Sequence, residues 1–157
     1  MRPRAELLEI MDMVCADVRE QAVGSVEVPE RLVVVSDSTA EVRHATGTTL
    51  YEDGGVIAFV NNSGVPFVEQ SDELVAQATK MSPVAVLLGG TAVSGRPGGT
   101  FRKVLAVQLF SVLHGIRTAR VAPVDTDAGG VISNVEAWRE VSAGPRMWAE
   151  QILGPAS

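Results

Sequence analysis

Cysteine, histidine and aromatic residues are all scarce in this chain of 157 residues. Its single cysteine, Cys15, excludes an intramolecular disulfide and any zinc site that needs several thiolates. The two histidines, His44 and His114, are too few for a histidine-rich metal centre. Neither has a Ser or Cys partner at a spacing typical of a hydrolytic triad. We therefore predict no metal site, and the catalytic residues stay unassigned.

Positive charge is also limited, because 13 Lys and Arg face 19 Asp and Glu and leave a formal net charge of −6. Surfaces that bind nucleic acid are usually basic, so we predict no nucleic-acid partner. No apolar run approaches the roughly 20 residues of a membrane-spanning helix. The acidic residues that follow the basic start are not typical of a secretory signal. We expect a cytoplasmic protein with no membrane partner.

What the chain does contain is the composition of a globular protein, with 46% apolar and 20% charged residues. Its length fits one domain, residues 1–157.

Hydrophobic periodicity predicts helices over residues 5–21, 71–80, 100–114 and 134–153. Short β-branched runs predict strands over residues 31–36, 55–60, 84–88 and 118–124. Residues 37–53 are predicted to form a loop. Strands alternating with helices in this way predict a three-layer, doubly wound parallel α/β sheet of about four strands.

In parallel sheets of this kind, ligands bind beyond the carboxyl ends of the strands. Four segments would lie there, at residues 36–38, 61–66, 89–99 and 125–130. The segment that opens with Gly89, Gly90 and Thr91 is predicted to be a loop whose backbone N–H groups approach an anion or a flat ring. Its spacing fits neither a P-loop nor GxGxxG, and a flexible surface loop is an equally good interpretation. Asn61, Asn62 and Ser63 could hydrogen-bond a polar heterocycle, with an ordinary turn as the alternative.

Other chemistry-bearing residues have plainer interpretations. Cys15 falls on the apolar face of the first predicted helix and reads as a buried thiol. Asp125 and Asp127 could bind a metal, but a solvated loop explains them better. Trp138 and Trp148 are expected in the core or at a subunit interface.

Three segments resemble the NADPH-dependent FMN reductase family, which has a flavodoxin-like fold. Residues 60–66 are similar to the flavin-binding segment after the family's third strand, and residues 82–90 to the Gly-Gly segment after its fourth. Residues 114–124 are similar to the fifth strand. The likeness covers roughly residues 55–153, but the family's first strand and the Gly-Ser part of its phosphate loop have no counterpart here.

The resemblance implies a flavin-binding oxidoreductase that passes hydride from NADPH to FMN, with the redox chemistry belonging to the cofactor. The backbone of Gly89, Gly90 and Thr91 would contact the isoalloxazine ring. The polar edge of the ring would contact Asn61, Asn62 and Ser63. The phosphate would bind to Arg2 or Arg4.

Two other functions stay open at this point. One is a non-catalytic flavodoxin-like partner or scaffold domain that has lost its cofactor. The other is a small-molecule transferase or lyase that uses the same glycine loop. The apolar run 104–110 predicts a helix buried on nearly all sides, and a sheet without its first strand would expose an edge. Both features predict a homodimer or a larger oligomer.

Overall fold

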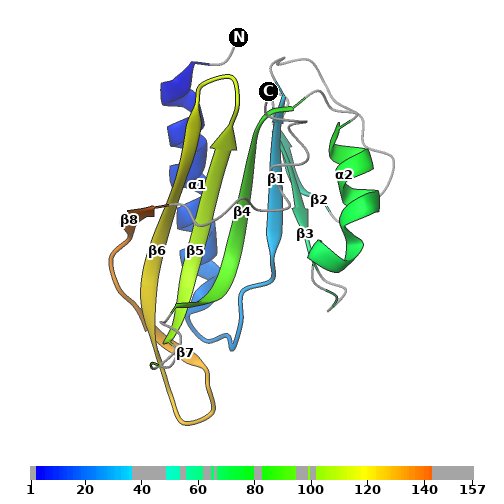
Figure 1. The fold of residues 1–157 in the computed structure, drawn as a ribbon. Coiled ribbons are helices and arrows are strands. Elements are labelled where there is room, and N and C mark those ends of the chain that lie inside the picture. Colours follow the sequence, from blue (N-terminus) through cyan, green and yellow to red (C-terminus); the bar gives the residue numbers. More distant parts are fainter. Residues whose placement is uncertain are drawn as a thin grey trace.

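A computed structural model describes residues 3–36, 49–53, 56–61, 65, 67–79, 83–94, 99 and 102–142. In this part of the chain, eight strands form one sheet that is accompanied by two α-helices and one short 3-10 helix (Figure 1). The elements in chain order are α1 (Arg4–Ala22), β1 (Arg31–Ser36), β2 (Thr49–Asp53), β3 (Val56–Val60), η1 (Phe67–Gln70), α2 (Ser71–Thr79), β4 (Pro83–Ser94), β5 (Arg102–Ser111), β6 (Ile116–Thr126), β7 (Ile132–Val135) and β8 (Arg139–Ser142).

The sheet has the order β2-β3-β1-β4-β5-β6, and every pair of neighbouring strands is antiparallel. Beyond β6, its outer edge is shared by two short strands: β8 pairs with residues 118–121 and β7 with residues 124–126. The prediction of a doubly wound parallel, flavodoxin-like sheet is therefore wrong. Consecutive strands β4, β5 and β6 pair with one another, and the turn of residues 112–115 joins β5 to β6, a short connection that antiparallel strands allow and parallel strands do not.

The largest single error concerns residues 100–114, which were expected to form a helix. Residues 102–111 are strand β5, with Val104 opposite Pro123 of β6 and Ala92 of β4. A short apolar run fits a strand buried on both faces as well as a buried helix, so periodicity alone does not separate them. The run 104–110 lies between β4 and β6 in a single copy of the chain, so it supplies no reason to expect a dimer.

Two further expectations are corrected over the residues that the structure describes. The final predicted helix is replaced over its described part by β7 and β8, and residues 143–157 lie outside that part. Residues 49–53 form β2 instead of loop. The other four strands and helices predicted before residue 84 are confirmed, with ends shifted by a residue or so.

The two helices cover opposite faces of the sheet, as the alternation along β1 shows. Val33 and Val35 pack in a core with α1, whereas Leu32 and Val34 pack in a core with η1 and α2. The buried residues of α1 are Leu7, Ile10, Met11, Val14, Cys15, Val18 and Ala22. These fall at the spacing that predicted an amphipathic helix. No helix in the described residues is long and apolar enough to span a membrane.

Candidate functional site

The glycine segment predicted to form a ligand-binding loop lies inside a strand. Gly89, Gly90 and Thr91 belong to β4, and each has a register partner on β5. Gly89 also pairs with Arg31 of β1. The strand continues to Ser94, so the predicted loop over residues 89–99 is wrong for its first six residues. In antiparallel strands backbone groups bond across the ladder, so the backbone of these residues is engaged with β5 instead of forming a loop.

The other residues predicted to bind flavin do not converge on one place. Arg4 donates a hydrogen bond to the carbonyl of His114 (3.3 Å), at the turn between β5 and β6. Asn61 lies at the opposite end of the sheet, where its Nδ2 donates to Glu30 Oε1 (3.2 Å) and to the carbonyl of Val65 (2.6 Å). Arg2, Asn62 and Ser63 lie outside the described residues.

The structure nevertheless brings some of the predicted residues together around a small pocket. We call it the Gly90 pocket; its volume is about 190 Å³. Its lining residues are Glu30, Leu88, Gly89, Gly90, Thr91, Ala92, Ala106 and Gln108. Pockets that hold drug-sized ligands measure roughly 300–1,000 Å³. The Gly90 pocket is therefore too small for a whole flavin mononucleotide and suits a compact ligand.

The floor of the Gly90 pocket is made of small residues. Gly90 has a φ of +150°, and a Cβ built on it would lie 3.4 Å from both the Cα of Glu30 and the carbonyl oxygen of Val28. Only glycine adopts this conformation without strain and allows the neighbouring backbone to come so close. Ala106 is the register partner of Gly90 on β5, and Ala92 follows on the same face of β4. The floor therefore consists of small residues without polar side chains.

Gln108 provides the polar feature of this pocket. Its side-chain oxygen Oε1 is buried and accepts no hydrogen bond from any residue that the structure describes. A buried acceptor without a donor costs about 1–3 kcal/mol, and such groups are rare in folded proteins. Gln108 is the one polar residue between Val104 and Phe110, and that isolation was the sequence signal that could have revealed it.

Glu30 precedes β1, which pairs with the edge of β4 opposite to β5, and it lines the Gly90 pocket while its carboxylate contacts Asn61. Its Oε1 accepts hydrogen bonds from Asn61 Nδ2 and from the backbone N–H of Phe67 (3.0 Å), the first residue of η1. Its Oε2 accepts none from the described residues. Two of the predicted site regions, Asn61 and Gly89–Thr91, therefore lie close together, through a carboxylate that the sequence analysis did not single out.

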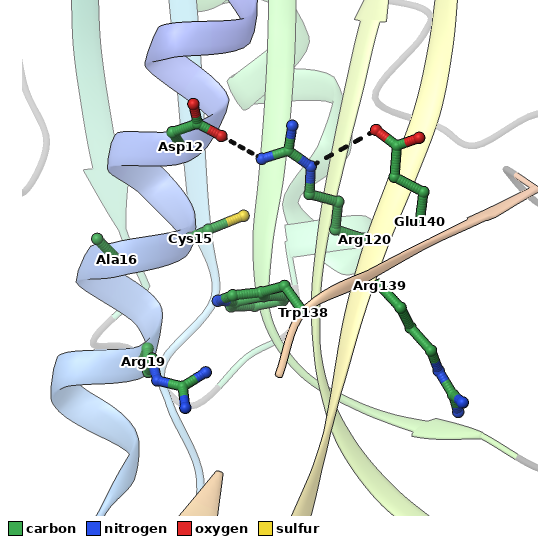
Figure 2. A pocket seen from close by; sticks show the side chains of 8 residues that line it. All are labelled: Asp12, Cys15, Ala16, Arg19, Arg120, Trp138, Arg139 and Glu140. Carbon is green, nitrogen blue, oxygen red and sulfur yellow. Dashed lines mark hydrogen bonds and ion pairs between the residues drawn. The ribbon is translucent and has the colours of Figure 1, made fainter. Parts of the chain in front are cut away.

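A second, larger pocket lies on the α1 face, between α1 and β8, and has a volume of about 460 Å³. We call it the Arg120 pocket (Figure 2). Arg120 of β6 forms ion pairs with Asp12 of α1 and with Glu140 of β8 (3.9 Å). Arg19 donates to the carbonyls of Val135 (2.8 Å) and Glu136 (2.9 Å). These contacts tie α1 to β6, β7 and β8.

Cys15 lies in the Arg120 pocket beside Trp138, with its sulfur directed towards Arg120 (Figure 2). Burial raises the pKa of the Cys15 thiol, and the hydrogen bond and charge of Arg120 oppose that rise only in part. A reactive cysteine needs a lowered pKa and access to solvent, whereas Cys15 is only 4% exposed. This agrees with the interpretation of Cys15 as a buried structural thiol.

The remaining candidates hold structural positions or lie outside the described residues. Asp127 Oδ1 accepts hydrogen bonds from the backbone N–H groups of Gly129 (2.8 Å) and Val131 (3.0 Å), so it closes the turn between β6 and β7. Among the residues described, no group of three or more His, Cys, Asp or Glu could hold a metal ion. His44 and Trp148 are not described.

In comparisons with known proteins, no family model, no curated protein and no solved structure matches this chain.

Proposed function

We propose that this chain is a small-ligand-binding domain and that its site is the Gly90 pocket. The observation that carries the proposal is Gln108, which lines that pocket and whose buried Oε1 has no hydrogen-bond partner among the described residues. A ligand that donates a hydrogen bond to this oxygen would offset its desolvation cost. The apolar floor of Gly90, Ala92 and Ala106 would bury the body of the same ligand.

Binding of benzamide tests this function, because the probe combines a flat ring with an amide that donates hydrogen bonds. In ¹H–¹⁵N spectra we expect benzamide to shift the backbone amide resonances of Gly90, Ala106 and Gln108 in a saturable manner. Ala106→Leu should fill the pocket and abolish these shifts. Ala16→Leu places the same side chain in the Arg120 pocket and should leave them intact.

Two results would contradict the proposal: no saturable shift at these three residues, or shifts that persist unchanged in Ala106→Leu. A folded spectrum of each variant must accompany the result. If Ala106→Leu does not fold, Gln108→Leu replaces it, since it removes the acceptor and keeps the size of the side chain.

The flavin-reductase activity remains a prediction of the sequence resemblance, as do FMN and NADPH, and the cytoplasmic location remains a prediction from the composition of the sequence. The described residues offer it limited support, because Arg4 and Asn61 lie apart and the Gly90 pocket is small. The transferase or lyase alternative rests on the same glycine loop, which is a strand.

Association with a second copy or with a protein partner is the second candidate function. Val112 and Leu113 are adjacent at the turn between β5 and β6, and they are 55% and 50% exposed. Sedimentation equilibrium at micromolar concentration tests self-association, with Leu113→Ser as the variant that should weaken it. A single species of about 16.6 kDa would contradict a homodimer.

A further inference from the structure

The Arg120 pocket on the α1 face differs from the Gly90 pocket in size and in charge. Its volume of about 460 Å³ lies within the range of roughly 300–1,000 Å³ that is typical of small-molecule sites. The charged residues that line it are Asp12, Arg19, Arg120, Arg139 and Glu140. Three arginines against two carboxylates leave one net positive charge, in a chain whose formal net charge is −6. The lining therefore favours a ligand with one negative charge.

The charges of this pocket are not equally compensated. Both carboxylates, those of Asp12 and Glu140, form ion pairs with Arg120. Arg19 donates to the backbone carbonyls of residues 135–136, and no carboxylate pairs with it among the residues that the structure describes. These two hydrogen bonds hold the guanidinium in place without neutralising it, and they leave three of its five N–H groups for another acceptor. Arg19 is exposed, so an anion can reach it from the solvent.

An aromatic side chain lines the same pocket as this uncompensated charge. Trp138 directly precedes β8, is half-buried and packs against the core that includes α1. Figure 2 shows its indole nearly edge-on and directed towards α1, with Arg120 above it and Arg19 below it. Arg139 points away from the indole in the same view. Aromatic rings pack favourably on one another in offset or edge-to-face arrangements, so the indole offers a surface to a second ring.

We infer that the Arg120 pocket binds a small aromatic carboxylate, at a site separate from the one proposed above. The carboxylate would accept hydrogen bonds from Arg19, because the planar guanidinium presents its donors in a fork that matches a carboxylate. The aromatic ring of the ligand would pack on the indole of Trp138. Three observations support this class of ligand together: the volume of the pocket, a guanidinium that is held in place without a carboxylate partner, and the neighbouring indole.

Benzoate, benzamide and acetate test this inference, because benzamide lacks the charge of benzoate and acetate lacks its ring. Binding to the whole chain is followed in ¹H–¹⁵N spectra through the backbone amides of Cys15, Ala16 and Arg19 and the indole N–H of Trp138. A charge-assisted hydrogen bond is roughly twice as strong as a neutral one, although solvent and salt screen an exposed guanidinium. We expect benzoate to bind about fivefold more tightly than benzamide at these residues, and acetate to cause no saturable shift.

Three substitutions separate the charge of Arg19 from its contacts with the backbone. Arg19→Lys keeps the charge and a donor for one of the two carbonyls, and should retain the preference for benzoate. Arg19→Gln also keeps a donor but removes the charge, and should reduce the ratio of affinities to about one. Arg4→Gln is the matched control: Arg4 lies in the first turn of α1, donates to a backbone carbonyl and does not line this pocket, so the fivefold ratio should remain.

Four results would overturn the inference. Equal affinity for benzoate and benzamide would show that Arg19 serves only the C-terminal end of α1, where the helix dipole favours a cation. A preference that survives Arg19→Gln would have another source, and one that is lost in Arg19→Lys would depend on the backbone contacts instead of the charge. Saturable binding of acetate would show that the ring plays no part. The proposed function is tested separately, because its shifts are read at Gly90, Ala106 and Gln108.

Discussion

On the α1 face of the sheet, the arginines that contact the helix have carboxylate or carbonyl partners, whereas on the α2 face the Gln108 amide oxygen has none. Arg31, Arg120 and Arg19 are all bonded in this way. The Arg120 pocket is more than twice as large as the Gly90 pocket, yet its polar groups serve to hold α1 in place. Arg31 Nε on the α1 face is also buried without a partner among the described residues, but Arg31 lines neither pocket, so unmet hydrogen-bonding capacity marks a candidate site only where it adjoins a pocket.

The strongest test of this comparison is Asp17→Asn. Arg31 is 1% exposed and forms its ion pair with Asp17, which is 34% exposed. Asparagine keeps an oxygen that can accept a hydrogen bond but removes the negative charge, so the buried guanidinium is left with neutral acceptors, among them Gln21 Oε1 (3.1 Å) and the Pro29 carbonyl (3.3 Å). We expect the free energy of unfolding in urea to fall by about 3 kcal/mol.

Asp12→Asn is the matched control, because Asp12 pairs with Arg120 at a site where the carboxylate is 65% exposed. An exposed pair of this kind contributes about 0.5 kcal/mol. Equal losses in the two variants would show that burial does not distinguish the pairs, and the contrast drawn here would not hold.

The sequence predicted local structure better than it predicted the pairing of strands. The spacing of Leu7, Met11 and Val18 is specific to an amphipathic helix, and α1 is confirmed. The run 104–110 carries no such information, because alternate faces of β5 are both buried, one against α1 and one on the α2 side. Antiparallel strand order depends on contacts between distant segments. The helices predicted over residues 71–80 and 100–114, each between two predicted strands, favoured a parallel sheet, and the second of them is strand β5.

Prediction of the site was limited for the same reason. Gly89, Gly90 and Thr91 were singled out as loop residues, and they line a pocket from within a strand. Glu30 and Gln108 were missed. They lie 78 positions apart in the chain and line the same pocket only because β4 pairs with both β1 and β5. No spacing rule connects residues whose proximity is set by strand order.

A smaller effect of opposite sign is expected for Gln108→Leu. Leucine is similar in size and removes the unpartnered acceptor, so the free energy of unfolding should rise by about 1 kcal/mol. Gln21→Leu is the matched control: Gln21 Oε1 accepts a hydrogen bond from Arg31, so its loss should lower stability. Reduced stability in Gln108→Leu would mean that Gln108 Oε1 has a hydrogen-bond partner in solution. The proposed function would then lose the observation on which it depends.

The smallest effect concerns the pH dependence of stability on the α1 face. The pKa of the Cys15 thiol is raised above its ordinary value of 9.0, chiefly by burial. The unfolded chain therefore loses this proton first as the pH rises, and ionisation favours the unfolded state. The contribution of the protonated thiol to the free energy of unfolding is complete below pH 9.0 and declines above it.

Urea unfolding between pH 8 and 10.5 should show a steeper decline of stability with pH in the parent protein than in Cys15→Ala, whose small cavity lowers stability equally at each pH. The difference between the two curves isolates the thiol, because the two proteins share every other ionisable group. Parallel curves would show that Cys15 ionises as readily in the folded protein as in the unfolded chain, and that the α1 face does not hold its thiol as the structure indicates.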